Sequence, residues 1–289
     1  MKKLLIKSSI ALSFVMLLSG CQNGESTQAE QTQTTETTEA SQASDDNELT
    51  LYLVRHGKTM LNTTDRVQGW SDAVLTPAGE EVVTDAGIGL KDIEFQGVYS
   101  SDSGRAIQTA DLILAENEQS KDLQVQKDSG LREFNFGTYE GDLNDSMWQD
   151  VADKQGVSLE EFQANMDPEV FADSVAELDQ EQMAEEGVEE GVNWPAEDYE
   201  TITDRLTESL DQIVTDEAQE SGSGNVLVTS HGLSITALLD TLFDDFKAPE
   251  EGLDNASVCI VKYKDGNYSL ESVNDTSYAE EGEKATQEN

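Results

Sequence analysis

The chain has 289 residues, with 60 acidic and 17 basic side chains and a formal net charge of −43. This excess of negative charge argues against nucleic acid as a partner, because basic side chains provide most of the affinity for phosphate backbones. Two cysteines, Cys21 and Cys259, are too few for a disulfide framework. Cys259 lies in an apolar run, and we expect it to be a buried small hydrophobic residue.

Residues 1–21 have the pattern of an export signal. Basic residues precede the apolar run 10–18, which is too short to span a bilayer stably. The run ends in Leu18-Ser19-Gly20-Cys21, which resembles the bacterial lipobox, where the cysteine is lipidated and becomes the new N-terminus. The alternative is a plain secretory signal with a cysteine at its cleavage site. We expect a lipoprotein signal peptide, a lipid on Cys21, and a protein anchored to the cell membrane that faces the outside of the cytoplasm.

The remaining chain divides by composition. Residues 22–47 are rich in Thr, Gln, Ser and Glu, and we predict a disordered tether there, because so few apolar residues cannot offset the ordering entropy. Residues 48–278 are long enough for one sizeable core. Residues 279–289 are predicted to be a polar, frayed tail. No other apolar stretch reaches the roughly 20 residues of a membrane helix, so we expect membrane contact only through the lipid anchor.

The first half of the domain alternates strands with helices. Short apolar runs predict strands, and Thr76-Pro77 and Ser103 are typical of helix starts. We predict strands over 49–54, 97–100 and 123–126, and helices from Thr76 to about Leu90 and from Ser103 to Ala115. This alternation predicts an α/β fold, in three α/β/α layers with a mostly parallel central sheet.

The pattern loosens over residues 142–197, which we name the cap segment. Short helical stretches at 147–153 and 159–165 give way to acidic, Gly-containing sequence, so we predict an inserted acidic helical cap over one end of the sheet. The chain then returns to regular elements. We predict helices over 199–218 and 234–243, a strand over 226–229, and a hairpin of strands 257–263 and 268–273 joined through Asp265-Gly266.

The two histidines, His56 and His231, occupy equivalent places in this pattern. Each follows an apolar strand and precedes a glycine. Ligands of open α/β sheets bind outside the carboxyl ends of the strands, so both imidazoles are expected at a binding site. A lone histidine is usually structural, but two in the same topological position weaken that interpretation. Metal binding is disfavoured, because the sequence has neither an H-E-x-x-H pattern nor a Cys/His cluster; we expect no metal and no cofactor.

The segment Leu53-Val54-Arg55-His56-Gly57-Lys58-Thr59 resembles the signature of the histidine phosphatase superfamily, which includes the cofactor-dependent phosphoglycerate mutases. Further matching pieces follow in the family's order: Asn62, 66–72 with 75–79, 100–110 with Arg105, 131–141 with Glu133, and 230–232. The sequence departs from the family at Lys58, where Glu is usual, and at Met60-Leu61, where a Trp is common. These departures affect local packing and pocket shape only.

The resemblance implies a role for each residue of this set. His56 would be the nucleophile that forms a phosphohistidine, Glu133 the general acid, and His231 a cation that stabilises the transition state. Arg55, Arg105 and Asn62 would bind the phosphate oxygens. The alternatives are surface ion pairs for the arginines and an ordinary solvated carboxylate for Glu133.

The resemblance implies a histidine acid phosphatase or phosphomonoesterase. Between Arg132 and Arg205 the only basic residue is Lys154, so a bisphosphate would be held poorly, and Phe136-Gly137-Thr138-Tyr139-Glu140-Gly141 resembles the broad-specificity phosphatase branch. Alternatives are a phosphoglycerate-mutase-type enzyme and a catalytically silent surface binding module. The expected partner is a small phosphomonoester; its identity and the oligomeric state stay open. Aromatic residues that could contact the leaving group are Phe134, Trp148, Phe162, Phe171 and Trp194.

Overall fold

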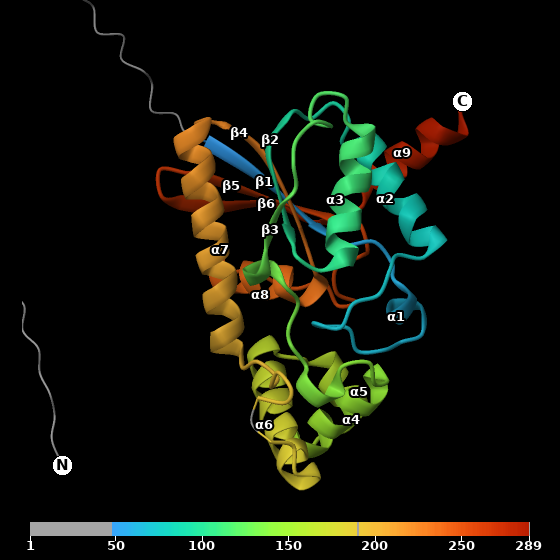
Figure 1. Cartoon of the computed structure of the whole chain (residues 1–289), viewed down its shortest axis with the longest axis vertical. Helices are drawn as coiled ribbons and strands as arrows, with labels where there is room; N and C mark the ends of the chain where they lie inside the picture. The colour runs from blue at the N-terminus through green and yellow to red at the C-terminus, as the bar shows by residue number, and fades with distance from the viewer. Residues whose placement is uncertain (1–47, 190, 289) are drawn as a thin grey trace, which may run out of the picture. The chain divides into compact units, whose positions relative to one another are not determined.

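The computed structural model describes residues 48–189 and 191–288, which contain one six-stranded sheet (Figure 1). The signal, Cys21 and the tether lie outside the described residues. The strand order is β3-β2-β4-β1-β5-β6. The strands are β1 (Glu48–Arg55), β2 (Phe95–Ser101), β3 (Gln126–Asp128), β4 (Gly224–Ser230), β5 (Val258–Lys264) and β6 (Asn267–Asp275).

The sheet is mixed. Strands β3, β2, β4 and β1 pair in parallel, whereas β5 pairs antiparallel with both β1 and β6. The expected α/β class is confirmed, and so is the hairpin, whose turn residues Asp265 and Gly266 have φ of 51° and 81°. Positive φ at both central positions suits the right-handed twist of the flanking strands. Strand β3 begins three residues later than predicted.

Alternate residues of β1 enter two separate hydrophobic cores, because successive side chains of a strand point to opposite faces. Leu51 and Leu53 belong to a cluster that includes residues of α7 (Tyr199–Glu220) and α8 (Gly232–Leu242). Tyr52 and Val54 belong to a second cluster, with residues of α2 (Pro77–Gly89) and α3 (Gly104–Glu116). Cys259 is buried in the first cluster, as predicted, and burial raises the pKa of its thiol to about 11.

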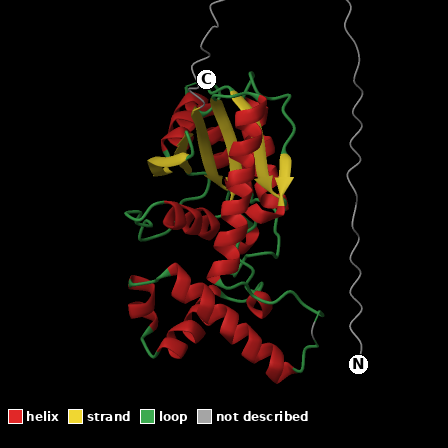
Figure 2. Cartoon of the chain, turned by 90° about the vertical axis from the view of Figure 1, so that its left-hand side faces the viewer, coloured by secondary structure: helices red, strands yellow, loops and turns green. Residues whose placement is uncertain are grey.

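The cap segment contains three helices, α4 (Asn144–Gln155), α5 (Leu159–Ala164) and α6 (Pro168–Glu186), which lie beyond one end of the strands (Figures 1 and 2). Helix α6 was not predicted. Its start and end signals are present: the Asp167 side chain accepts a hydrogen bond from Val170 N, Pro168 is the first helical residue, and Gly187 ends the helix with φ of 70°. The many acidic residues of α6 hid this helix in the sequence pattern.

The expected frayed C-terminus is wrong for residues 279–287, which belong to helix α9 (Ser277–Gln287). Helix α9 packs closely on α2 through two glycines. A Cβ atom on Gly282 would lie 1.9 Å from the Asp85 carbonyl oxygen, and one on Gly89 would lie 2.1 Å from the Tyr278 carbonyl oxygen. Because glycine has no Cβ atom, these two positions permit the close packing of α9 on α2. Within the described residues, every helix is too short or too polar to cross a membrane.

Candidate active site

The two histidines meet where neighbouring parallel strands end. His56 directly follows β1 and His231 directly follows β4, and the register pairs Arg55 with Ser230. The two imidazole centroids are 5.2 Å apart. The equivalent placement predicted from the sequence therefore brings both rings into one site.

His56 is held by hydrogen bonds on three sides. Its backbone N donates to the Ser230 carbonyl oxygen at 3.0 Å, and Asn255 Nδ2 donates to the His56 carbonyl oxygen at 2.9 Å. Its Nδ1 lies 2.8 Å from the Gly57 carbonyl oxygen, which can only accept, so Nδ1 carries the proton and Nε2 keeps a free lone pair. Burial, helped by Arg105 and Arg55, lowers the pKa of His56 well below its ordinary value. The ring is therefore neutral and able to act as a nucleophile.

His231 is fully buried, and its Nε2 lies 2.8 Å from Ser101 Oγ. Its Nδ1 is buried and has no partner among the described residues. Burial, followed by the charge of Arg105, lowers the pKa of His231 well below its ordinary value. The expected cationic His231 therefore applies only when a bound anion offsets this shift.

Protein oxygens anchor both arginines, but not every guanidinium nitrogen is paired. Arg105 is fully buried and donates to the carbonyl oxygens of Ser71 and Gly69 and to Asp72 Oδ1, over distances of 2.8 to 3.1 Å. Arg55 donates through Nη1 to the Leu253 carbonyl oxygen. The Nε atoms of both arginines are buried without a partner in the described part of the chain.

These arginines are not ordinary surface ion pairs. With His231 Nδ1, their two Nε atoms make three unsatisfied buried nitrogens, and each such group costs about 1–3 kcal/mol when it stays unpaired. All three side chains are close enough to His56 to interact with it electrostatically. Asn62 adds a further donor, because its Oδ1 accepts from Thr59 N at 3.1 Å within a capping box, while its Nδ2 has no partner among the described residues.

Glu133 lies at the N-terminus of α8 and is almost fully buried. Its Oε1 accepts from Phe134 N at 3.1 Å, Ser234 N at 2.9 Å and Ser234 Oγ at 2.8 Å. Within the described ranges its Oε2 accepts only from Leu233 N, at 3.1 Å, so Oε2 has capacity left for a proton. The alternative of an ordinary solvated carboxylate is therefore wrong.

The ion pair of Arg205 with Glu197 holds the backbone around Glu133, and sequence reasoning missed it. Arg205 Nη2 donates to the Glu133 carbonyl oxygen at 2.9 Å, and Nη1 donates to those of Gly130 and Arg132 at 2.9 and 2.7 Å. Glu197 accepts from Arg205 Nε at 2.9 Å and from Asn135 N at 3.0 Å. No local motif signals this contact, because Arg205 lies in α7, far along the chain from Glu133.

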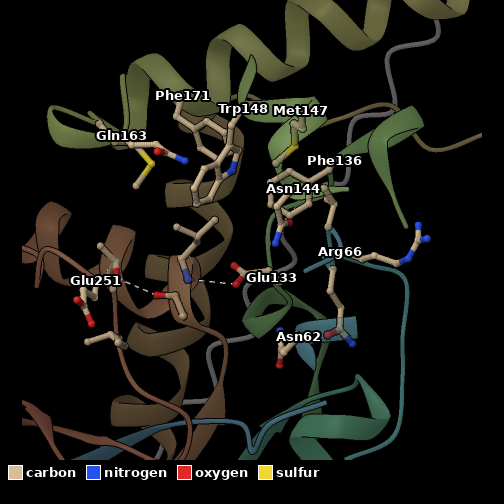
Figure 3. A pocket seen from close by; sticks show the side chains of 18 of the residues that line it. Asn62, Arg66, Glu133, Phe136, Asn144, Met147, Trp148, Gln163, Phe171 and Glu251 are labelled. Atoms are coloured by element: carbon tan, nitrogen blue, oxygen red, sulfur yellow. Dashed lines mark hydrogen bonds between the residues drawn. The ribbon is translucent and has the colours of Figure 1, made fainter. Parts of the chain in front are cut away.

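A cavity of about 360 Å³ opens beside His56. Arg55, His56, Asn62 and Glu133 line one end, and the cap segment contributes much of the rest (Figure 3). His231 and Arg105 are fully buried and do not line it. Of the predicted aromatic contacts, Trp148, Phe162 and Phe171 line the cavity, whereas Phe134 is core and Trp194 is 69% exposed.

In the described part of the chain, no cluster of three or more His, Cys, Asp or Glu side chains could hold a metal ion.

Known proteins resemble this chain over most of its length. It is 30% identical over 244 residues to the broad-specificity phosphatase YOR283W of Saccharomyces cerevisiae, covering 83% of this chain and 91% of that protein. It is 27% identical over 194 residues to the probable phosphoglycerate mutase GpmB of Erwinia tasmaniensis, covering 67% and 74%. The crystal structure of a phosphoglycerate mutase from Bacillus anthracis superposes with a TM-score of 0.74 at 43% identity, covering 83% of this chain and 98% of that one.

The sequence pattern of the histidine phosphatase superfamily, branch 1, matches residues 51–185 and 169–276. These ranges include the strand ends that carry His56 and His231 and the segment that carries Glu133. The chain belongs to the histidine phosphatase superfamily.

Proposed function

We propose that the protein hydrolyses phosphomonoesters through a phosphohistidine on His56. The observation that carries this proposal is the neutral His56 ring, with a free Nε2 lone pair, beside three buried nitrogens that lack partners. The phosphate oxygens of a substrate would accept from Arg55, Arg105 and His231, which neutralise the charge that repels a nucleophile.

The reaction takes two steps on this geometry. His56 Nε2 attacks phosphorus, the bond from phosphorus to the ester oxygen breaks, and Glu133 Oε2 gives its proton to the departing oxygen. Glu133 then takes a proton from water, which attacks the phosphohistidine and releases inorganic phosphate and a free His56. Each proton that Glu133 gives in the first step returns in the second.

A mutase is the second candidate, because two of the similar proteins bear that name. A mutase must retain a doubly phosphorylated intermediate, which needs further cations in the cavity. Among the described residues, Arg66 is the only basic side chain besides Arg55 that lines the cavity, and its Nη1 donates to the Gly141 carbonyl oxygen at 2.7 Å. Glu250 and Glu251 also line the cavity. This charge balance favours release of the substrate's alcohol and transfer to water.

Trapping the intermediate tests the proposal. Acid quenching during turnover of a labelled phosphomonoester should give no stable phosphoenzyme, whereas alkaline quenching should retain the label on His56. The His56→Ala variant should carry no label and release no phosphate. An acid-stable phosphoenzyme would contradict the phosphohistidine. Conversion of 3-phosphoglycerate to 2-phosphoglycerate that depends on added bisphosphoglycerate, without net phosphate release, would favour the mutase.

We also propose that a lipid on Cys21 holds the enzyme at the outer side of the cell membrane. The support is the basic start, the short apolar run and Leu18-Ser19-Gly20-Cys21. Two acyl chains give stable anchoring where one is marginal. The Cys21→Ala variant should move from the membrane fraction to the soluble or secreted fraction. A variant that remains as membrane-bound as the parent would remove the anchor proposal.

A further inference from the structure

The phosphate end of the cavity determines where the rest of a substrate must lie. In the proposed reaction, the phosphate lies at the His56 ring, where Arg55 lines the cavity and the buried unpaired nitrogens of Arg105 and His231 attract it from behind the lining, and the ester oxygen lies at Glu133 Oε2. The leaving group therefore extends from Glu133 into the part of the cavity lined by the cap segment. What lines this part decides which alcohols the enzyme accepts.

One wall of this part is aromatic. Phe136, Trp148, Phe162 and Phe171 line it together with Met147, and Phe171 lies 6.2 Å, between ring centroids, from both Phe136 and Phe162 (Figure 3). Such a wall binds aromatic or other apolar groups by burying their surface. A strongly hydrated leaving group, such as a polyol, would gain little there.

Two carboxylates from outside the cap segment also line the cavity. Glu250 and Glu251, in the loop between α8 and β5, are exposed and form no ion pair with any described residue. Figure 3 shows Glu251 across the cavity from Asn62 and Arg66. Arg66 keeps its positive charge, but its Nη1 donates to the Gly141 carbonyl oxygen at 2.7 Å, and its guanidinium lies on the opposite side of the cavity from Glu251 (Figure 3).

We infer that the cavity selects monophosphate esters whose leaving group is apolar and carries an ammonium group. Aromatic faces and carboxylates together are the surroundings that proteins use for ammonium ions. A leaving group that carries a carboxylate or a second phosphate meets repulsion at the same place. The inference rests on the proposed hydrolysis at His56 and assigns Glu250 and Glu251 as specificity-determining residues.

Three aryl phosphates of matched size test the inference. They are the phenyl phosphates that carry a 4-(2-aminoethyl), a 4-propyl and a 4-(2-carboxyethyl) group, whose phenol leaving groups are similar in reactivity. Exposed ion pairs contribute about 0.2–1 kcal/mol each, so two carboxylates should favour the cationic over the anionic substrate by about tenfold in kcat/KM. The double variant Glu250→Gln/Glu251→Gln should bring this ratio close to one, with the neutral substrate little changed.

A matched control separates the effect of carboxylates at the cavity from the effect of the protein's net charge. The variant Glu185→Gln/Glu186→Gln removes two exposed carboxylates from the end of α6, away from the cavity lining, and should keep the parent's ratio. If both double variants changed the ratio of kcat/KM for the cationic over the anionic substrate equally, the inference would be overturned. A ratio near one in the parent enzyme would overturn it as well. Failure of the proposed function looks different: the parent would hydrolyse none of the three esters, or His56→Ala would hydrolyse them as well as the parent.

Discussion

The two ends of the cavity are built differently. At the phosphate end, strand ends and the start of α8 place buried side chains, and backbone groups hold them: Gly57 and Ser230 hold His56, and Leu233 and Ser234 hold Glu133. Away from these groups, side chains of the cap segment and two exposed carboxylates contribute to the lining. Backbone contacts thus fix the residues that we propose to carry the chemistry, whereas exchangeable side chains line the part that we propose to set the selectivity.

The largest expected effect comes from Glu133→Gln at the phosphate end. An amide cannot supply a proton, so alkyl esters such as glycerol phosphate should lose about 10²–10⁴-fold in kcat, the usual value of a general acid. Aryl esters should lose much less in the first step, because their leaving groups need little protonation. The rate of phosphoenzyme formation in a single turnover, measured for an alkyl and an aryl ester, tests this difference. Equal losses would show that Glu133 is not the acid.

Arg205→Met should have the next largest effect, although Arg205 touches no substrate. It removes three hydrogen bonds to carbonyl oxygens around Glu133, and misplacement by about 1 Å can cost up to about 10²-fold in rate. The loss should be larger for alkyl than for aryl esters, as for Glu133→Gln. Arg205→Lys should recover part of the rate.

A double-mutant cycle sharpens this test. If Arg205 acts through Glu133, then Arg205→Met should cost little further activity toward alkyl esters in the Glu133→Gln background. Additive losses, or losses that are equal for alkyl and aryl esters, would show that Arg205 merely supports the fold.

The two ends also differ in how far the sequence predicts them. His56 and His231 were located because a short apolar strand followed by His-Gly is a local pattern. The role of Arg205 depends on a contact between α7 and the segment around Glu133, which no local pattern encodes. Helix α6 was missed because its acidic residues obscured the apolar pattern, and the docking of α9 depends on the close approach at Gly89 and Gly282. Local signals thus predicted where the two histidines lie, whereas the contacts that support the site come from tertiary structure.

Sulfate binding should be coupled to the protonation of His231. Burial and Arg105 lower the pKa of His231 in the empty site, whereas a bound dianion favours its cationic form and raises that pKa again. Binding should therefore take up a proton between these two pKa values, so affinity rises as the pH falls, by up to about tenfold per pH unit for one proton. Calorimetry in buffers of different ionisation enthalpy measures the uptake. His231→Gln should abolish it; unchanged uptake would assign the proton to another group, such as His56.

The smallest expected effect lies at the cap end, with Trp148→Leu. Trp148 lines the cavity and is only partly buried, so leucine should be tolerated while the aromatic contact with an aryl leaving group is lost. Such contacts contribute about 0.5–1.5 kcal/mol, which corresponds to a rise of about 2–13-fold in KM for aryl phosphates. Inhibition by inorganic phosphate should not change, because phosphate occupies only the other end.

Trp194→Leu is the matched control, since Trp194 is exposed and does not line the cavity. If Trp148→Leu weakened phosphate inhibition as much as it raised the KM, the two ends would not act separately, and selectivity could not be assigned to the cap segment.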